Sequence, residues 1–214
     1  MAATFGASGL GFGALSGWAI QDSSADDENK RANVLDENGD EATSNVYDDT
    51  TQVTTTYKAS GQAGGGSPNI PNIGAIVNGI VVTSISLSTD SEDFATMTLT
   101  GHVHIGGDHG TLKEKDHGIT LDDAFGASAF GVSGGDSVRS GDCTITCEHI
   151  DVPGENGDTV AGENYDAKIE LTVRLLGSGG SAPNGYDRIG DSTTGSNTDF
   201  QYNEIRAIKG LSFA

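Results

Sequence analysis

Basic residues are scarce in this chain, which has 11 Lys and Arg residues against 31 Asp and Glu residues and a formal net charge of −20. Proteins that hold nucleic acid use Lys and Arg to displace counterions from phosphate, and anionic membranes attract basic segments in the same way. The composition therefore argues against a nucleic-acid-binding protein and against a protein bound to a membrane surface. Three reasons for the acidity stay open: solubility, adaptation to high salt, and a wall to which passing DNA does not bind.

Long apolar runs are also missing. The first 20 residues, MAATFGASGLGFGALSGWAI, lack a basic start and are interrupted by five glycines. A continuous apolar helix is unfavourable there, and no stretch of the chain reaches the ~20 apolar residues of a membrane span. We expect neither a secretory signal nor a membrane anchor.

Cysteines and aromatic residues are few. The two cysteines lie in CTITC (residues 143–147), whose β-branched residues favour a strand. On a strand, Cys143 and Cys147 share a face but lie about 13 Å apart, whereas a disulfide needs Cα atoms within about 7 Å, so we expect two buried thiols. An aromatic content of 6% with one Trp leaves few stacking platforms for a carbohydrate-binding module.

Familiar catalytic motifs are scarce in the sequence. It has no phosphate-binding loop and no dinucleotide-binding fingerprint, and its G-x-S-x-G pattern, GVSGG (residues 131–135), does not follow a predicted strand, as a nucleophile elbow requires. Adjacent carboxylates such as Asp122 and Asp123 point to opposite faces of an extended chain and make poor acid–base pairs. We therefore predict that the protein is not an enzyme and uses no cofactor.

Histidines are unusually concentrated in TGHVHIGGDHG (residues 100–110). His102 and His104 share one face of a strand and could present two imidazoles to Zn²⁺, with Asp108, His109 or His117 as a third ligand. A metal centre needs ligands that are held in place, and two consecutive glycines separate the strand from Asp108 and His109. We therefore predict that these histidines lie at a strand end and bind no metal. A metal-dependent hydrolase centred on His102 and His104 is kept as a remote alternative.

Glycine is abundant, at 32 of 214 residues, and stretches of alternating apolar and polar residues recur along the chain. Such alternation is typical of half-buried strands, and the Asn-Gly dipeptides at 38–39 and 78–79 favour tight hairpins. The sequence predicts an all-β fold, a sandwich or a barrel, with at most one short helix. Strands are expected in residues 31–35, 50–58, 76–88, 96–105, 143–150 and 165–176, and residues 200–213 form either a final strand or a short helix.

The chain divides into an arm and one domain. Residues 1–30 are rich in Gly, Ala and Ser and end in the acidic run DSSADDEN, which predicts an arm that is flexible or ordered only by another subunit. Residues 31–214 form a single β-rich domain, with long Gly- and Asp-rich loops expected at 61–74, 106–142 and 177–198.

Three stretches carry a resemblance to a known family: RANVLDENGDEATSNVYDDTTQVTTTY (31–57), PNIGAIVNGIVVTSI (71–85) and DFATMTLTGH (93–102). They resemble small virion proteins of tailed bacteriophages, of the tail-tube and neck type. The resemblance implies a subunit that forms closed rings, usually sixfold, which stack into a tube around a lumen that conducts DNA. Its partners would be its own copies and other virion proteins, and it would be made in the host cytoplasm and reside in the virion.

A subunit of this kind needs joints between copies. Exposed strand edges serve as such joints in assembled β proteins, and arms can order on docking. We expect an assembly interface formed by Phe12, Trp18, Val53, Tyr57, Ile70 and Ile73. A capsid decoration protein, a minor capsid protein or a neck protein is the alternative within a virion.

Overall fold

The computed structural model describes residues 11–38, 40–61, 67–104, 112–135, 137–153, 159–177, 179–196 and 199–213. These residues form nine strands and no helix, so the all-β prediction is confirmed. The strands are β1 (Trp18–Leu35), β2 (Glu41–Ala59), β3 (Ile76–Val77), β4 (Ile80–Asp90), β5 (Thr96–His104), β6 (Ser137–Pro153), β7 (Thr159–Leu176), β8 (Asp187–Ser196) and β9 (Asp199–Leu211).

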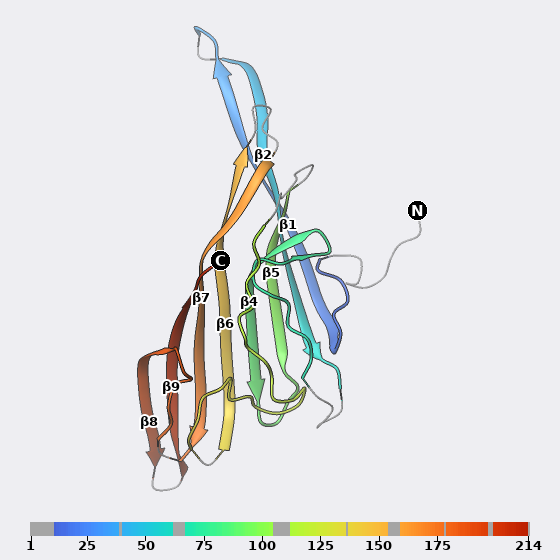
Figure 1. Cartoon of the computed structure of the whole chain (residues 1–214). Coiled ribbons are helices and arrows are strands. Elements are labelled where there is room, and N and C mark those ends of the chain that lie inside the picture. Colours follow the sequence, from blue (N-terminus) through green and yellow to red (C-terminus); the bar gives the residue numbers. More distant parts are fainter. Residues whose placement is uncertain are drawn as a thin grey trace.

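The strands form one large antiparallel sheet in the order β1-β2-β5-β4-β6-β7-β9-β8, and the short β3 pairs with β4. Figure 1 shows β1 and β8 at opposite sides of this sheet. Because these two strands do not pair with each other, the sheet is open. The fold is sandwich-like, and the alternative of a closed barrel does not hold for the single chain.

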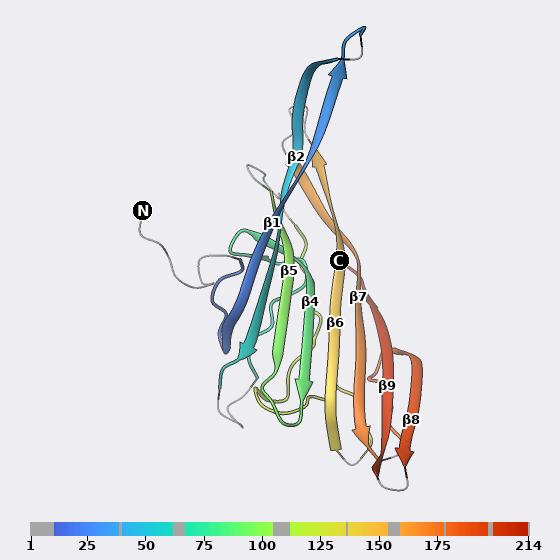
Figure 2. The ribbon, with the colours of Figure 1, turned by 180° about the vertical axis from the view of Figure 1, so that it is seen from behind.

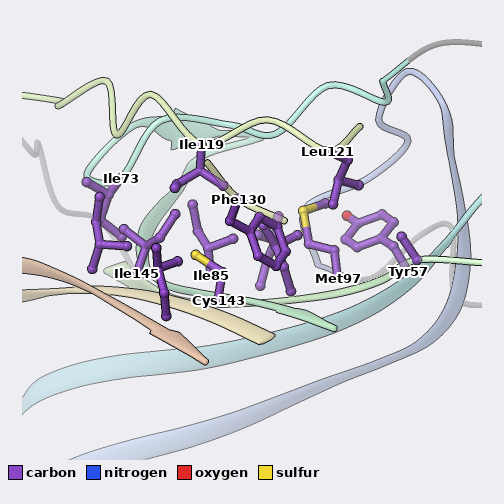
Figure 3. Close-up of a cluster of buried hydrophobic side chains, with 14 of the residues drawn as sticks. Tyr57, Ile73, Ile85, Met97, Ile119, Leu121, Phe130, Cys143 and Ile145 are labelled. Carbon is purple, nitrogen blue, oxygen red and sulfur yellow. The ribbon is translucent and has the colours of Figure 1, made fainter. Parts of the chain in front are cut away.

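The second layer of the sandwich consists of loops. Residues 67–75 and 112–135, which we call the covering loops, lie over one face of the sheet. Figure 3 shows Ile73, Ile119, Leu121 and Phe130 of these loops facing side chains of β2, β4, β5 and β6. Alternate residues of the strands supply the other half of this core, all of them at most 1% exposed: Tyr57, Ile85, Leu87, Met97, Leu99, Cys143, Ile145, Ile169 and Leu171.

Both predicted hairpin turns join strands, but by different means. The connection between β3 and β4 is the tight Asn78-Gly79 turn, in which both residues have positive φ, 53° and 80°. The connection between β1 and β2 spans residues 36–40, where the Asp36 N–H donates to the Asp40 carbonyl oxygen at 2.8 Å. The Asp36 carboxylate caps this loop by accepting from the N–H groups of Asn38 and Asp40, at 2.8 and 2.9 Å.

Several predicted boundaries need correction. The arm boundary at residue 31 lies inside β1, which begins at Trp18, and the loop expected at 106–142 ends before β6 begins at Ser137. The loop expected at 177–198 contains β8, and residues 200–213 lie in strand β9 and the two residues after it. β1 and β8 lack an apolar alternation because each is an outer strand of the sheet, so that little of either strand lies against the core.

Candidate assembly surface

One face of the sheet is polar and is not covered by the described loops; we call it the bare face. Its centre is built from small hydroxyl side chains, because Thr and Ser alternate with core residues along β2, β5, β4 and β6. The strand pairing aligns them into two rows across four strands, Thr54–Thr100–Ser84–Thr146 and Thr56–Thr98–Ser86–Thr144. The hydroxyls of Thr54 and Thr100 lie 3.4 Å apart, and those of Thr56 and Thr98 lie 3.3 Å apart.

Charges on the bare face lie mainly around this hydroxyl centre, and several form ion pairs. The Lys168 Nζ lies 2.9 Å from Glu170 Oε1, and the hydrogen bond to Glu170 raises the pKa of Lys168. The Arg206 guanidinium lies 2.7 Å from Glu204 Oε1. In these two pairs, opposite charges neutralise each other.

The sheet ends at the outer edges of β1 and β8. Each of these strands pairs with one neighbour only in the described part of the chain, β1 with β2 and β8 with β9. Every pairing along the eight-strand path is antiparallel. With eight strands in the path, β1 and β8 therefore run in opposite directions.

Two hairpins extend beyond the body of the sheet from the same end (Figures 1 and 2). The pairing of β2 with β5 stops at Thr50, so residues 30–47, which we call the β1–β2 arm, pair only with each other among the described strands. The β6–β7 hairpin does the same beyond Glu148. Exposed apolar side chains lie on both: Val34 and Leu35, 58% and 60% exposed, and Ile150 and Val152, 52% and 50% exposed.

The residues that the sequence assigned to an assembly interface lie in the core of the single chain. Phe12, Trp18, Val53, Tyr57 and Ile73 are at most 6% exposed, and Ile70 is partly buried against the same core. Hydrogen bonds hold two of them: Trp18 Nε1 donates to the Asn69 carbonyl oxygen at 2.7 Å, and the Tyr57 hydroxyl donates to the Gly13 carbonyl oxygen at 2.8 Å. We therefore withdraw their assignment to an interface, because a folded copy does not present them to a neighbour.

The predicted position of the histidines is correct in part. His102 and His104 fall in the last three residues of β5, and half-buried His102 continues the bare-face alternation of Thr98 and Thr100. Asp108 and His109 lie outside the described residues. Within the described residues, no cluster of three His, Cys, Asp or Glu side chains could hold a metal ion.

His117 has a structural environment instead. It is 6% exposed, its Nδ1 accepts from the Ile119 N–H at 3.0 Å, and its Nε2 lies 3.1 Å from the Pro71 carbonyl oxygen. The ring is therefore neutral, with its proton on Nε2, and it links the two covering loops. Burial lowers its pKa below the ordinary value of 6.5, against smaller opposing effects of the Pro71 hydrogen bond and the Asp116 charge.

His149 anchors the base of the β6–β7 hairpin. Its Nδ1 lies 2.7 Å from Asn164 Oδ1 and its Nε2 lies 3.1 Å from Asp151 Oδ1. The Asn164 amide in turn donates to the carbonyl oxygens of Gly74 and Lys113, at 3.2 and 3.0 Å. This network joins the hairpin to both covering loops.

The two cysteines are free and buried, as expected. Burial raises the pKa of both thiols to about 12, so that neither carries the negative charge of a nucleophile near neutral pH. Both lie on the core side of β6, and the Cys147 thiol donates to the Val82 carbonyl oxygen at 3.8 Å. Their role is in packing.

The chain has no match among known protein families or curated proteins. In the described residues there is no helix of the length and apolar character needed to span a membrane. The surfaces described above are thus the basis for a functional proposal.

Proposed function

We propose that the chain is a structural subunit of a tailed-phage virion, most simply a tail-tube subunit whose copies join into rings that stack around a lumen. The proposal draws on the resemblance of three sequence stretches to that family and on the geometry of the sheet. It includes no cofactor and no catalysis. The protein would act by assembling with its own copies and with other virion proteins.

The observation that carries the proposal is the antiparallel relation of β1 and β8. A copy rotated about an axis roughly parallel to the strands brings its β8 beside the β1 of its neighbour, with the two strands antiparallel. The alternation of strand directions then continues from copy to copy, and the outer backbone groups of both strands gain hydrogen-bond partners. Repeating one such heterologous contact around an axis closes a ring.

In this ring we place the bare face toward the lumen, because the covering loops occupy the opposite face. Hydroxyl side chains hydrate well and carry no positive charge that would bind phosphate. Such a wall differs from the acid-lined lumen that the composition suggests. It lets DNA pass for a related reason, namely that paired charges and neutral hydroxyls offer little net attraction.

Lysines placed on the β8 edge test the proposal. Ser192→Lys with Thr194→Lys adds two charges to an exposed edge strand, and edge lysines oppose strand pairing between molecules. The wild-type protein is expected to form rings or tubes that sediment faster than single copies, whereas the double variant stays as folded single copies. Sedimentation velocity measures the assembly and circular dichroism measures the fold.

Thr120→Lys with Ser133→Lys is the matched control. It adds the same charge at two exposed positions of residues 112–135, outside β1 and β8. The control should assemble like the wild type. If the β8 variant also assembles like the wild type, β8 is not a joint. Isolated trimers of the wild type would favour a decoration protein over a tube subunit.

A further inference from the structure

The end of the sheet opposite the β1–β2 arm carries a pocket of about 270 Å³ lined by Asp90, Arg139, Ser140, Arg174 and Tyr202, which we call the arginine pocket. Pairing across β4, β6 and β7 aligns Asp90, Ser140 and Arg174 in one row on the bare face. β4 ends at Asp90 and β6 begins at Ser137. Figures 1 and 2 show this end of the two strands far from the tip of the arm.

The two arginines of this pocket have weak interactions, or none, with carboxylates of the described part of their own chain. Arg174 lies over the Tyr202 ring, 4.6 Å from its centroid, and forms no ion pair within the described part of the chain. Arg139 lies 3.8 Å from a Glu92 carboxylate that is 81% exposed. By contrast, Lys58, Lys168, Arg188 and Arg206 each have a carboxylate oxygen within 3.0 Å. In a chain of net charge −20, two guanidinium groups and one carboxylate, Asp90, leave this pocket with a net positive charge, which suits a carboxylate from elsewhere.

The tip of the β1–β2 arm, residues 34–41, has the complementary character. It holds four acidic residues, and the Asp36 carboxylate caps its own loop. Glu37 and Asp40 are exposed, and Asp40 takes part in the loop through its backbone N–H and carbonyl oxygen. The exposed Leu35 next to them is matched near the pocket by Phe200, 69% exposed, which lies two residues before Tyr202 on β9 and so on the same face.

We propose that the arginine pocket binds the acidic arm tip of a second copy, with Glu37 and Asp40 paired to Arg139 and Arg174 and Leu35 packed against Tyr202 and Phe200. The β2 strand alone has 19 residues, which span about 60 Å. Tip and pocket lie at opposite ends of the molecule, so no copy fills its own pocket, and the contact is head-to-tail. The inference rests on the proposed function, in which this contact joins one ring to the next.

Charge reversal tests the contact from both sides. Glu37→Lys with Asp40→Lys inverts the tip while leaving the Asp36 cap in place, and Arg139→Glu with Arg174→Glu inverts the pocket. Either pair places like charges together and should raise the protein concentration needed for tubes by at least about tenfold, while rings joined through β1 and β8 remain. All four substitutions in one chain restore opposite charges and should restore tubes. Electron microscopy and sedimentation velocity distinguish tubes, single rings and single copies.

Lys113→Glu with Lys115→Glu is the control for the pocket variant, since it makes the same change in net charge in residues 112–135, outside the pocket and the bare face. It should form tubes like the wild type. The tip does not bind the pocket if both double variants form tubes as well as the wild type does. The same conclusion follows if the variant with all four substitutions forms tubes no better than the two double variants. Head-to-tail chains that depend on these charges but contain no rings would support the contact between tip and pocket and would contradict the proposed tube. Single copies at every concentration of wild-type protein would overturn both proposals.

Discussion

His117 shows how single residues hold the loop layer on the sheet. Its neutral ring accepts one hydrogen bond from Ile119 and donates another to Pro71, and the cost of charging it in this buried place lowers its pKa. An unfolded chain takes up a proton at this side chain near its ordinary pKa of 6.5, whereas the folded chain does so only at lower pH. The stability due to neutral His117 is therefore complete above pH 6.5 and is lost as the pH falls below it.

Replacing His117 by glutamine tests the direction of this pH dependence of stability. An amide can accept a hydrogen bond from Ile119 and donate one to Pro71 without titrating. His117→Gln therefore removes the pH-dependent contribution of residue 117 to the free energy of unfolding. Between pH 7 and pH 5 the free energy of unfolding of the wild type, measured in urea at each pH, should fall relative to that of the variant. Taking the difference removes the titration of the many carboxylates that both proteins share. A difference that does not change with pH would contradict a neutral buried ring.

Some residues could be assigned from the sequence and others could not. The cysteines were predictable as buried thiols, because the β-branched residues between them fix a strand and its face. Phe12 and Trp18 were not, because the glycines around them indicate an arm, whereas both side chains complete the core beneath the loops. His117 was predicted only as a possible metal ligand, because its partners Pro71 and Ile119 become neighbours only in the folded chain.

Strand glycines reveal how closely the elements approach. A Cβ at Gly101 of β5 would collide with the Val81 carbonyl oxygen and would lie 2.9 Å from the Phe12 ring. At Gly210 of β9 the same atom would meet nothing within 4 Å. Gly101 thus makes room for the N-terminal segment to pack on the sheet.

The substitutions Gly101→Ala and Gly210→Ala separate this effect from the general preference of alanine over glycine. Overpacking at residue 101 should cost about 2–3 kcal/mol, whereas the change at residue 210 should be within about 1 kcal/mol of neutral. Urea denaturation of the two variants and the wild type measures both. Equal stabilities of the two variants would show that the core rearranges around residue 101 without cost and would contradict overpacking there.

At the scale of elements, alternation in the sequence predicted the inner strands well. The patterns TQVTTTY, SISLS, TMTLT and CTITC each combine buried residues with the hydroxyls of the bare face, so they also contain the signal of that face. β8, in a stretch rich in Gly, Ser and Thr, and most of β1 were missed, because outer strands and arms bury few side chains. We assign assembly to β1 and β8. The sequence therefore predicted the core of the single chain better than the proposed contacts between copies.

At the scale of the whole molecule, acidic, hydroxyl and basic side chains lie in different parts of the sheet. Acidic residues gather on the β1–β2 arm tip, hydroxyls form the centre of the bare face, and two weakly paired arginines lie at the far end. In the proposed assembly, each of these features is complemented by another part of an identical copy. The closed core under the covering loops lets the single copy fold before it assembles.

A three-dimensional electron cryo-microscopy map of purified protein at high concentration tests the central claim most directly. It should show rings in which β1 of one copy runs antiparallel to β8 of the next, with the Thr and Ser rows facing the lumen. Dispersed single copies at the highest concentration, or an assembly in which neither β1 nor β8 touches a neighbouring copy, would contradict it.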